Sequence, residues 1–119
     1  MKKIIKLYQG NAILIGIVLS VSVFVGCKKN NVSANPGANE VFMQSSKFNP
    51  SAKTISRGTT ITWINKDSYN HTVTSSTSGI FDSGQLGQNK TFSYTFATAG
   101  TFAYYCADHS GMTGTITVQ

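Results

Sequence analysis

The chain has 119 residues, which is enough for one folded domain and an appendage. Its formal net charge of +6 would suggest a nucleic-acid partner, but half of the ten basic residues lie at or before Lys29. From residue 40 onward five cations stand against four anions, which leaves a net charge of +1. No basic cluster of the kind that binds phosphates occurs there, so we expect no nucleic-acid partner.

The first 26 residues have the pattern of a secretory signal peptide. Three lysines precede an uncharged apolar run of 15 residues, from Ala12 to Gly26, whereas a membrane-spanning helix needs about 20 apolar residues. The run ends in Phe24-Val25-Gly26-Cys27, which resembles a bacterial lipobox and implies cleavage before Cys27 and lipidation of that residue. We therefore expect residues 1–26 to be removed. The alternative is an uncleaved N-terminal anchor helix.

Residues 27–39 are predicted to tether the domain to a membrane. After the lipidated Cys27 they form a polar, Asn-rich stretch with one Pro-Gly pair and no apolar period, which is typical of a flexible linker. Either interpretation of the leader places the domain outside the cytoplasm, in the periplasm or an equivalent compartment, beside a membrane. Exported proteins often contain disulfides, but we expect none here because Cys27 is assigned to lipid.

Residues 40–119 are predicted to form an all-β domain. Short runs rich in β-branched and aromatic residues alternate with Gly-containing turns, and no helical period is present. We expect the core to include Met43 and Trp63, the sole tryptophan. The predicted strands are 41–43 continued by 48–50, then 53–56, 59–65, 71–74, 91–96, a strand that ends at Cys106, and 113–118.

A cysteine, a histidine and a methionine follow one another at intervals of three: Cys106, His109 and Met112. Phe102, Tyr104 and Cys106 alternate along an extended segment, so the thiol should point into the core with the aromatic rings. A buried, inert side chain would be the ordinary interpretation of an isolated cysteine. The histidine and methionine that follow it favour a metal ligand instead. A thiolate, two imidazoles and a weak axial thioether are the ligands of blue-copper sites.

The second imidazole must be sought at His71, the only other histidine in the chain. It begins an extended segment, His71-Thr72-Val73, so a fold that pairs this segment with the strand before Cys106 could bring it to the loop. The sequence therefore predicts that two distant segments share one metal centre.

On these residues the chain resembles a cupredoxin of the amicyanin, pseudoazurin and plastocyanin-related group. The spacing Cys-x-x-His-x-x-Met resembles the short loop of amicyanin-like members. The resemblance implies a Greek-key β-sandwich or barrel of seven to eight strands, a monomer, and one type 1 copper ion. The matching stretches span nearly all of residues 40–119, and the implied copper ligands are His71, Cys106, His109 and Met112.

The resemblance also implies a function: a carrier of single electrons between redox partner proteins, with His109 at the surface as the exit for the electron. The sulfur of Cys106 should accept backbone N–H hydrogen bonds that tune the reduction potential. The alternative is a lipid-anchored protein that binds copper for delivery, storage or sensing. Zinc could also occupy these ligands. A Cys–His pair can mark a nucleophile, but no acid/base machinery accompanies it, so we expect no enzyme.

Two residues depart from the pattern of the group. Asn70 stands where many relatives have proline before the histidine, and Asp108 stands where amicyanin-like loops have proline next to the loop histidine. A carboxylate beside an imidazole favours the imidazolium. We therefore expect Asp108 to raise the pH at which His109 is protonated in the reduced protein.

Overall fold

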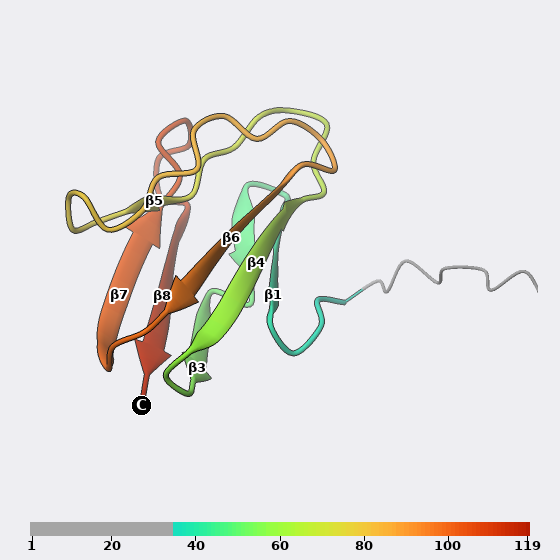
Figure 1. The fold of residues 1–119 in the computed structure, drawn as a ribbon. Helices are drawn as coiled ribbons and strands as arrows, with labels where there is room; N and C mark the ends of the chain where they lie inside the picture. Colours follow the sequence, from blue (N-terminus) through green and yellow to red (C-terminus); the bar gives the residue numbers. More distant parts are fainter. Residues whose placement is uncertain (1–34) are drawn as a thin grey trace, which may run out of the picture. The chain divides into compact units, whose positions relative to one another are not determined.

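The computed structural model describes residues 35–119, which form a sandwich of two four-stranded sheets (Figure 1). This confirms the predicted all-β fold class. No residue from 35 to 119 is helical, so that part of the chain contains no helix long and apolar enough to span a membrane. The predicted signal peptide and Cys27 lie outside the described residues. The strands are β1 (Glu40–Gln44), β2 (Lys47–Asn49), β3 (Ala52–Ile55), β4 (Thr59–Asn65), β5 (Thr74–Ser75), β6 (Thr91–Phe96), β7 (Gly100–Tyr105) and β8 (Thr113–Val118).

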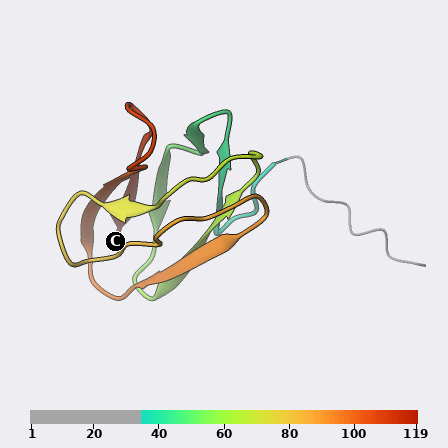
Figure 2. The same ribbon diagram turned by 90° about the horizontal axis from the view of Figure 1, so that it is seen from above.

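One sheet has the strand order β2-β1-β4-β6 and the other has the order β3-β8-β7-β5. Two pairs, β1 with β4 and β3 with β8, are parallel, and the other pairs are antiparallel. The chain changes sheets between β3 and β4 at Arg57-Gly58, where Gly58 has a φ of 83° that other residues rarely adopt. The loops around residues 66–73, 82–90 and 106–112 lie together at the end of the sandwich opposite the C-terminus (Figures 1 and 2).

The first hairpin differs from the prediction. The segments 41–43 and 48–50 were expected to continue one strand, but β1 and β2 are antiparallel partners joined at Ser45-Ser46. Both serines have positive φ, 55° and 54°, as a tight two-residue hairpin turn requires. Asn and Gly are the usual residues at such positions, so the Ser-Ser pair carries no turn signal of its own.

The segment 71–74, predicted as a strand, is also different. His71 forms only an isolated bridge with Leu86, and the strand β5 is limited to Thr74–Ser75, paired with β7. The reason lies in the hydrogen bonds of Val73, whose N–H donates to the side chain of Ser83 at 2.8 Å and whose carbonyl accepts from the Ser83 N–H at 3.1 Å. The loop that follows residue 80 thus takes the place of a neighbouring strand.

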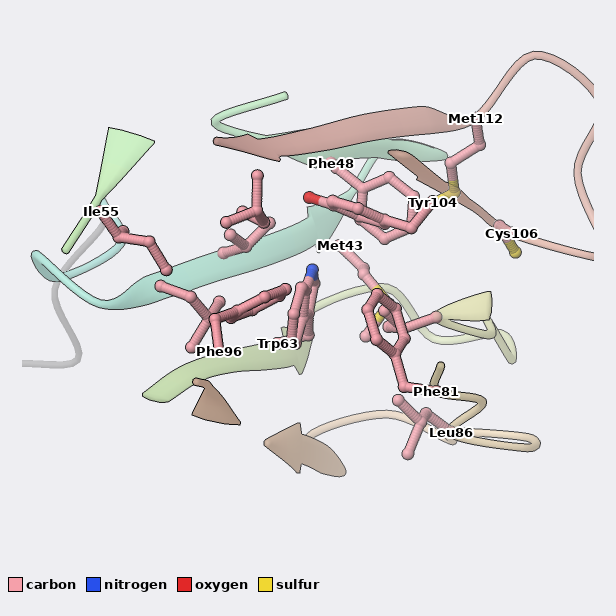
Figure 3. Close-up of a cluster of buried hydrophobic side chains, with 14 of the residues drawn as sticks. Met43, Phe48, Ile55, Trp63, Phe81, Leu86, Phe96, Tyr104, Cys106 and Met112 are labelled. Carbon is pink, nitrogen blue, oxygen red and sulfur yellow. The ribbon is translucent and has the colours of Figure 1, made fainter. Parts of the chain in front are cut away.

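The predicted strands 59–65, 91–96 and 113–118 agree with β4, β6 and β8. Their apolar faces meet around Trp63, which is fully buried and contacts Tyr104 edge-on with the ring centroids 5.4 Å apart. Met43 is also fully buried, so both residues belong to the core as predicted. In Figure 3 the sulfur atoms of Cys106 and Met112 lie at one end of this cluster. The core thus ends at two of the predicted copper ligands.

Candidate metal centre

Three possible ligand atoms converge at the end of the sandwich. One ring nitrogen of His71, the Sγ of Cys106 and one ring nitrogen of His109 all lie within 4.8 Å of one another. The Sγ atom is 3.7 Å from Nδ1 of His71 and 3.5 Å from Nδ1 of His109. His71 is 35 positions from Cys106, so the fold joins the two predicted segments as the sequence analysis expected.

The loop after β7 returns His109 and Met112 to the thiol by closing on itself. The N–H of Cys106 donates to the carbonyl of Met112 at 2.9 Å, and the N–H of Met112 donates to the carbonyl of His109 at 3.2 Å. Gly111, with a φ of 81°, makes the turn between them. Cys106 and Met112 are both buried, and Cys106 is a free thiol. The loop therefore presents a thiol, an imidazole and a buried thioether together.

Asn65, at the end of β4, holds the loop that carries His71, a role for which the sequence contained no signal. Its amide nitrogen donates to the carbonyls of Tyr69 and Leu86, at 2.7 and 2.8 Å, and its amide oxygen accepts the N–H of Asp67 at 2.8 Å. The side chain is fully buried, so these bonds are shielded from water and strong. His71 is also fully buried and is paired with Leu86 through two backbone hydrogen bonds.

The sulfur of Cys106 accepts a hydrogen bond from the backbone N–H of Thr72 at 3.3 Å. This confirms the expected backbone bond to the sulfur. The hydroxyl of Thr72 in turn accepts the N–H of Ala107 at 2.8 Å. The residues that follow His71 and Cys106 are thus bonded to each other, which ties the two ligand segments together.

A carboxylate does contact a ligand imidazole, but it belongs to Asp67 and not to Asp108. Oδ2 of Asp67 lies 2.8 Å from Nε2 of His71, and the carboxylate also accepts the N–H groups of Ser45 and Ser46. Burial acts to raise the pKa of Asp67, but hydrogen bonds from Ser46, Ser45 and His71 together outweigh it, so the pKa is lowered. Asp108 instead accepts a hydrogen bond from the side chain of Gln85 at 2.8 Å.

Tyr69 covers the outer side of both imidazoles. Its ring centroid is 5.1 Å from that of His71 and 5.4 Å from that of His109, and its hydroxyl bonds to Oγ of Ser46 at 2.9 Å. The tyrosine is 44% exposed and His109 is half-buried, so the loop histidine and an aromatic ring meet the solvent side by side. No pattern in the sequence around Tyr69 indicates this role.

The donor set fits copper. The cluster of one thiol and two imidazole nitrogens, with the thioether of Met112 on a residue bonded to Cys106 through the backbone, combines soft and borderline ligands. Magnesium and calcium instead prefer carboxylate and carbonyl oxygens. The cysteine is buried beside both imidazoles, as a metal thiolate would be. Fold and donors together define a copper-binding β-sandwich.

Residues 37–119 match the family described as copper binding proteins, plastocyanin/azurin family. The chain belongs to this family of cupredoxins, and its cofactor is copper. This result confirms the family resemblance and the cofactor predicted from the ligand spacing.

Individual relatives agree with this assignment. Plastocyanin of Scenedesmus fuscus is 36% identical in an alignment 90 positions long that covers 60% of this chain and 86% of that protein. Amicyanin of Paracoccus denitrificans is 30% identical in an alignment 93 positions long that covers 70% of this chain and 66% of amicyanin. Among solved structures, a purple cupredoxin from Nitrosopumilus maritimus aligns with a TM-score of 0.63 and 27% identity, over 67% of this chain and 98% of that one.

Proposed function

We propose that this protein carries single electrons between redox partner proteins, with one copper ion held by His71, Cys106, His109 and Met112. The observation that carries the proposal is the convergence of three donor atoms within 4.8 Å at one end of the sandwich. Membership of the plastocyanin/azurin family supports it. Bound copper would supply the one-electron chemistry, while the chain supplies the frame, which consists of the hydrogen-bonded loops that hold the four ligand residues.

Hydrogen bonds keep this frame in place. Asn65 fixes the loop before His71, and the N–H of Thr72 fixes the sulfur of Cys106. Outer hydrogen bonds of this kind orient metal ligands and limit their movement. Ligands that move little when the oxidation state of the metal changes lower the reorganisation energy of electron transfer. The arrangement thus favours a fast relay over slow uptake and release of the metal.

We place the exit for the electron at His109. Its ring is half-buried beside the exposed Tyr69, and the adjoining Ser110 and Gly111 are small and exposed. A partner protein can therefore approach this edge of the centre closely. His71, by contrast, is fully buried and offers no direct contact to a partner.

Two matched cysteine variants test the copper centre. In the copper-loaded protein we expect an intense visible absorption from the thiolate–copper bond. Cys106→Ser should abolish this absorption, whereas Cys27→Ser should preserve it. His71→Ala should also abolish the chromophore and the redox wave. An unchanged spectrum in Cys106→Ser or His71→Ala would refute the assigned ligands.

The rate of electron self-exchange tests the proposed activity itself. Line broadening in mixtures of oxidised and reduced protein measures this rate. Fast exchange is expected for a carrier whose ligands are held in place. Tight copper binding combined with slow self-exchange would contradict the proposal and favour copper delivery, storage or sensing.

We further propose that the mature protein begins at a lipidated Cys27 and works as a membrane-anchored monomer outside the cytoplasm. The basic start, the apolar run and the lipobox-like Phe24-Val25-Gly26-Cys27 support this placement. Mass spectrometry of the N-terminal peptide from the membrane fraction should show an acylated Cys27. The variant Cys27→Ser should lose the modification and the membrane association. An unmodified peptide that begins at Met1 would support the uncleaved anchor helix instead.

A further inference from the structure

We propose that the β1–β2 turn and Asp67 form an outer clamp that selects the ring nitrogen with which His71 faces the thiol. Asp67 is the positioning residue, and Ser45 and Ser46 hold it. The inference rests on the proposed role of His71 as a copper ligand and identifies the residues that keep it in a binding-competent state.

The geometry at Asp67 determines the tautomer of His71. Oδ2 of Asp67 lies 2.8 Å from Nε2 of the ring, on the side away from the sulfur, while Nδ1 lies 3.7 Å from Sγ of Cys106. An ionised carboxylate can only accept hydrogen bonds, so Nε2 must carry the proton. Nδ1 then has a free lone pair on the edge of the ring that faces Sγ of Cys106. Histidine ligands are commonly oriented by a carboxylate on their second nitrogen in this way.

The hairpin turn keeps the carboxylate in this position. The N–H of Ser45 donates to Oδ1 at 2.8 Å and the N–H of Ser46 donates to Oδ2 at 3.1 Å, from residues 22 and 21 positions away in the sequence. Both serines are in the left-handed region, which aims two consecutive N–H groups at one anion. The side chain of Asp67 is only 12% exposed, so water competes weakly for these bonds.

The same turn reaches the centre by a second route. Oγ of Ser46 bonds to the hydroxyl of Tyr69 at 2.9 Å, and the tyrosine ring packs on both imidazoles. The turn thus holds the site through two contacts, one with Asp67 and one with Tyr69. Removal of the carboxylate should release the first contact and leave the second intact.

The experiment compares Asp67→Ala and Asp67→Asn with the control Glu40→Ala in the full chain, before and after loading with Cu(I). The carboxylate of Glu40 also accepts a backbone N–H, that of Gly37 at 2.9 Å, but it lies at the end of β1 away from the clamp, so Glu40→Ala should behave as wild type. Nitrogen-15 NMR of the ring of His71, at a pH where the ring is neutral, reports its tautomer. Competition with a chelator reports the Cu(I) affinity.

We expect wild type and Glu40→Ala to show a single tautomer with the proton on Nε2. Asp67→Ala should show both tautomers and bind Cu(I) about 10- to 100-fold more weakly. Asp67→Asn retains an acceptor for the ring but places an NH2 group near the N–H of Ser45. It should therefore keep the tautomer while the Ser45 amide exchanges faster with solvent.

Two results would overturn the clamp. One is a pure Nε2–H tautomer with unchanged affinity in Asp67→Ala, which would make Asp67 only a cap for the hairpin turn. The other, which applies even where the alanine variant does not fold, is unchanged exchange of the Ser45 amide in Asp67→Asn. The NMR measurement of the tautomer involves no electron transfer. A slow self-exchange rate would therefore contradict the proposed electron carrier and leave the clamp intact, whereas an unchanged tautomer in Asp67→Ala would contradict only the clamp.

Discussion

The backbone N–H of Thr72 donates a hydrogen bond to the sulfur of Cys106 at 3.3 Å. This bond links the residue that follows His71 directly to the ligand Cys106. A donor to a thiolate withdraws electron density from it and so favours the reduced metal. The hydroxyl of Thr72 stabilises this contact, because it accepts the N–H of Ala107 beyond the cysteine. The pair is therefore both a structural link and a means of setting the reduction potential.

Replacing Thr72 by the isosteric valine should lower the reduction potential of the copper protein. Thr72→Val removes the acceptor for Ala107 and loosens the position of the N–H donor to sulfur. The free energy of unfolding should fall by about 1–3 kcal/mol, because the Thr72 hydroxyl also bonds to the hydroxyl of Thr74 at 3.1 Å and both hydrogen bonds are lost. Voltammetry and denaturant titration measure the two effects. The control Thr95→Val removes a surface hydroxyl that is bonded to Thr60, and it should leave the potential unchanged.

Replacing Met112 by leucine should raise the reduction potential while copper remains bound. The thioether of Met112 would be the weakest donor to the copper, and loss of a donor disfavours Cu(II) more than Cu(I). Met112 and Met43 are both buried, so either substitution by leucine should cost about 1 kcal/mol or less. Met43→Leu is the matched control. Equal potentials in the two variants would show that Met112 is only a core residue.

A methyl group at Gly114 should destabilise the domain. Gly114 lies opposite Tyr104 in the pairing of β7 with β8, and a Cβ atom there would overlap the phenol ring and hydroxyl of Tyr104. Overpacking of this kind costs about 1–3 kcal/mol. Gly114→Ala should lower the midpoint of denaturant unfolding. Gly87→Ala, where the nearest atom would be at an ordinary 3.5 Å, should change it little.

Replacing Tyr104 by phenylalanine should remove part of the loss of stability at alkaline pH. Burial raises the pKa of Tyr104 from 10.0 to about 12, against a smaller opposing effect of the Trp63 N–H. Below pH 10 the phenol is neutral in both the folded and the unfolded chain. Between pH 10 and about 12 the unfolded chain releases this proton more readily, so stability falls as pH rises.

Unfolding of wild type and Tyr104→Phe at pH 8 and pH 11 tests this expectation. At pH 8 the variant should be as stable as wild type or slightly more stable, because the Tyr104 hydroxyl is buried and makes no hydrogen bond within residues 35–119. At pH 11 the difference in favour of the variant should be larger. A constant difference at both values would mean that Tyr104 titrates at its ordinary pKa in the folded protein.

Much of the metal centre could be predicted from local sequence. Cys106, His109 and Met112 lie within seven residues, so their spacing and the alternating pattern of the preceding strand were enough to suggest a shared metal. Strands β4, β6 and β8 were predicted at their observed bounds because their apolar residues recur with period two. His71 could be assigned only because one other histidine exists in the chain.

The surroundings of the ligands were decided by tertiary structure. Asn65 and Asp67 read as ordinary polar residues at the end of a strand and in a loop, and their role depends on partners about 20 positions away. Asp108 was expected to act on His109 because it adjoins that residue in sequence; its side chain bonds to Gln85, and its effect on His109 stays a prediction. Short-range patterns carry ligand identity, whereas long-range hydrogen bonds to backbone groups, which have no side-chain signature, set how His71 and Cys106 are held.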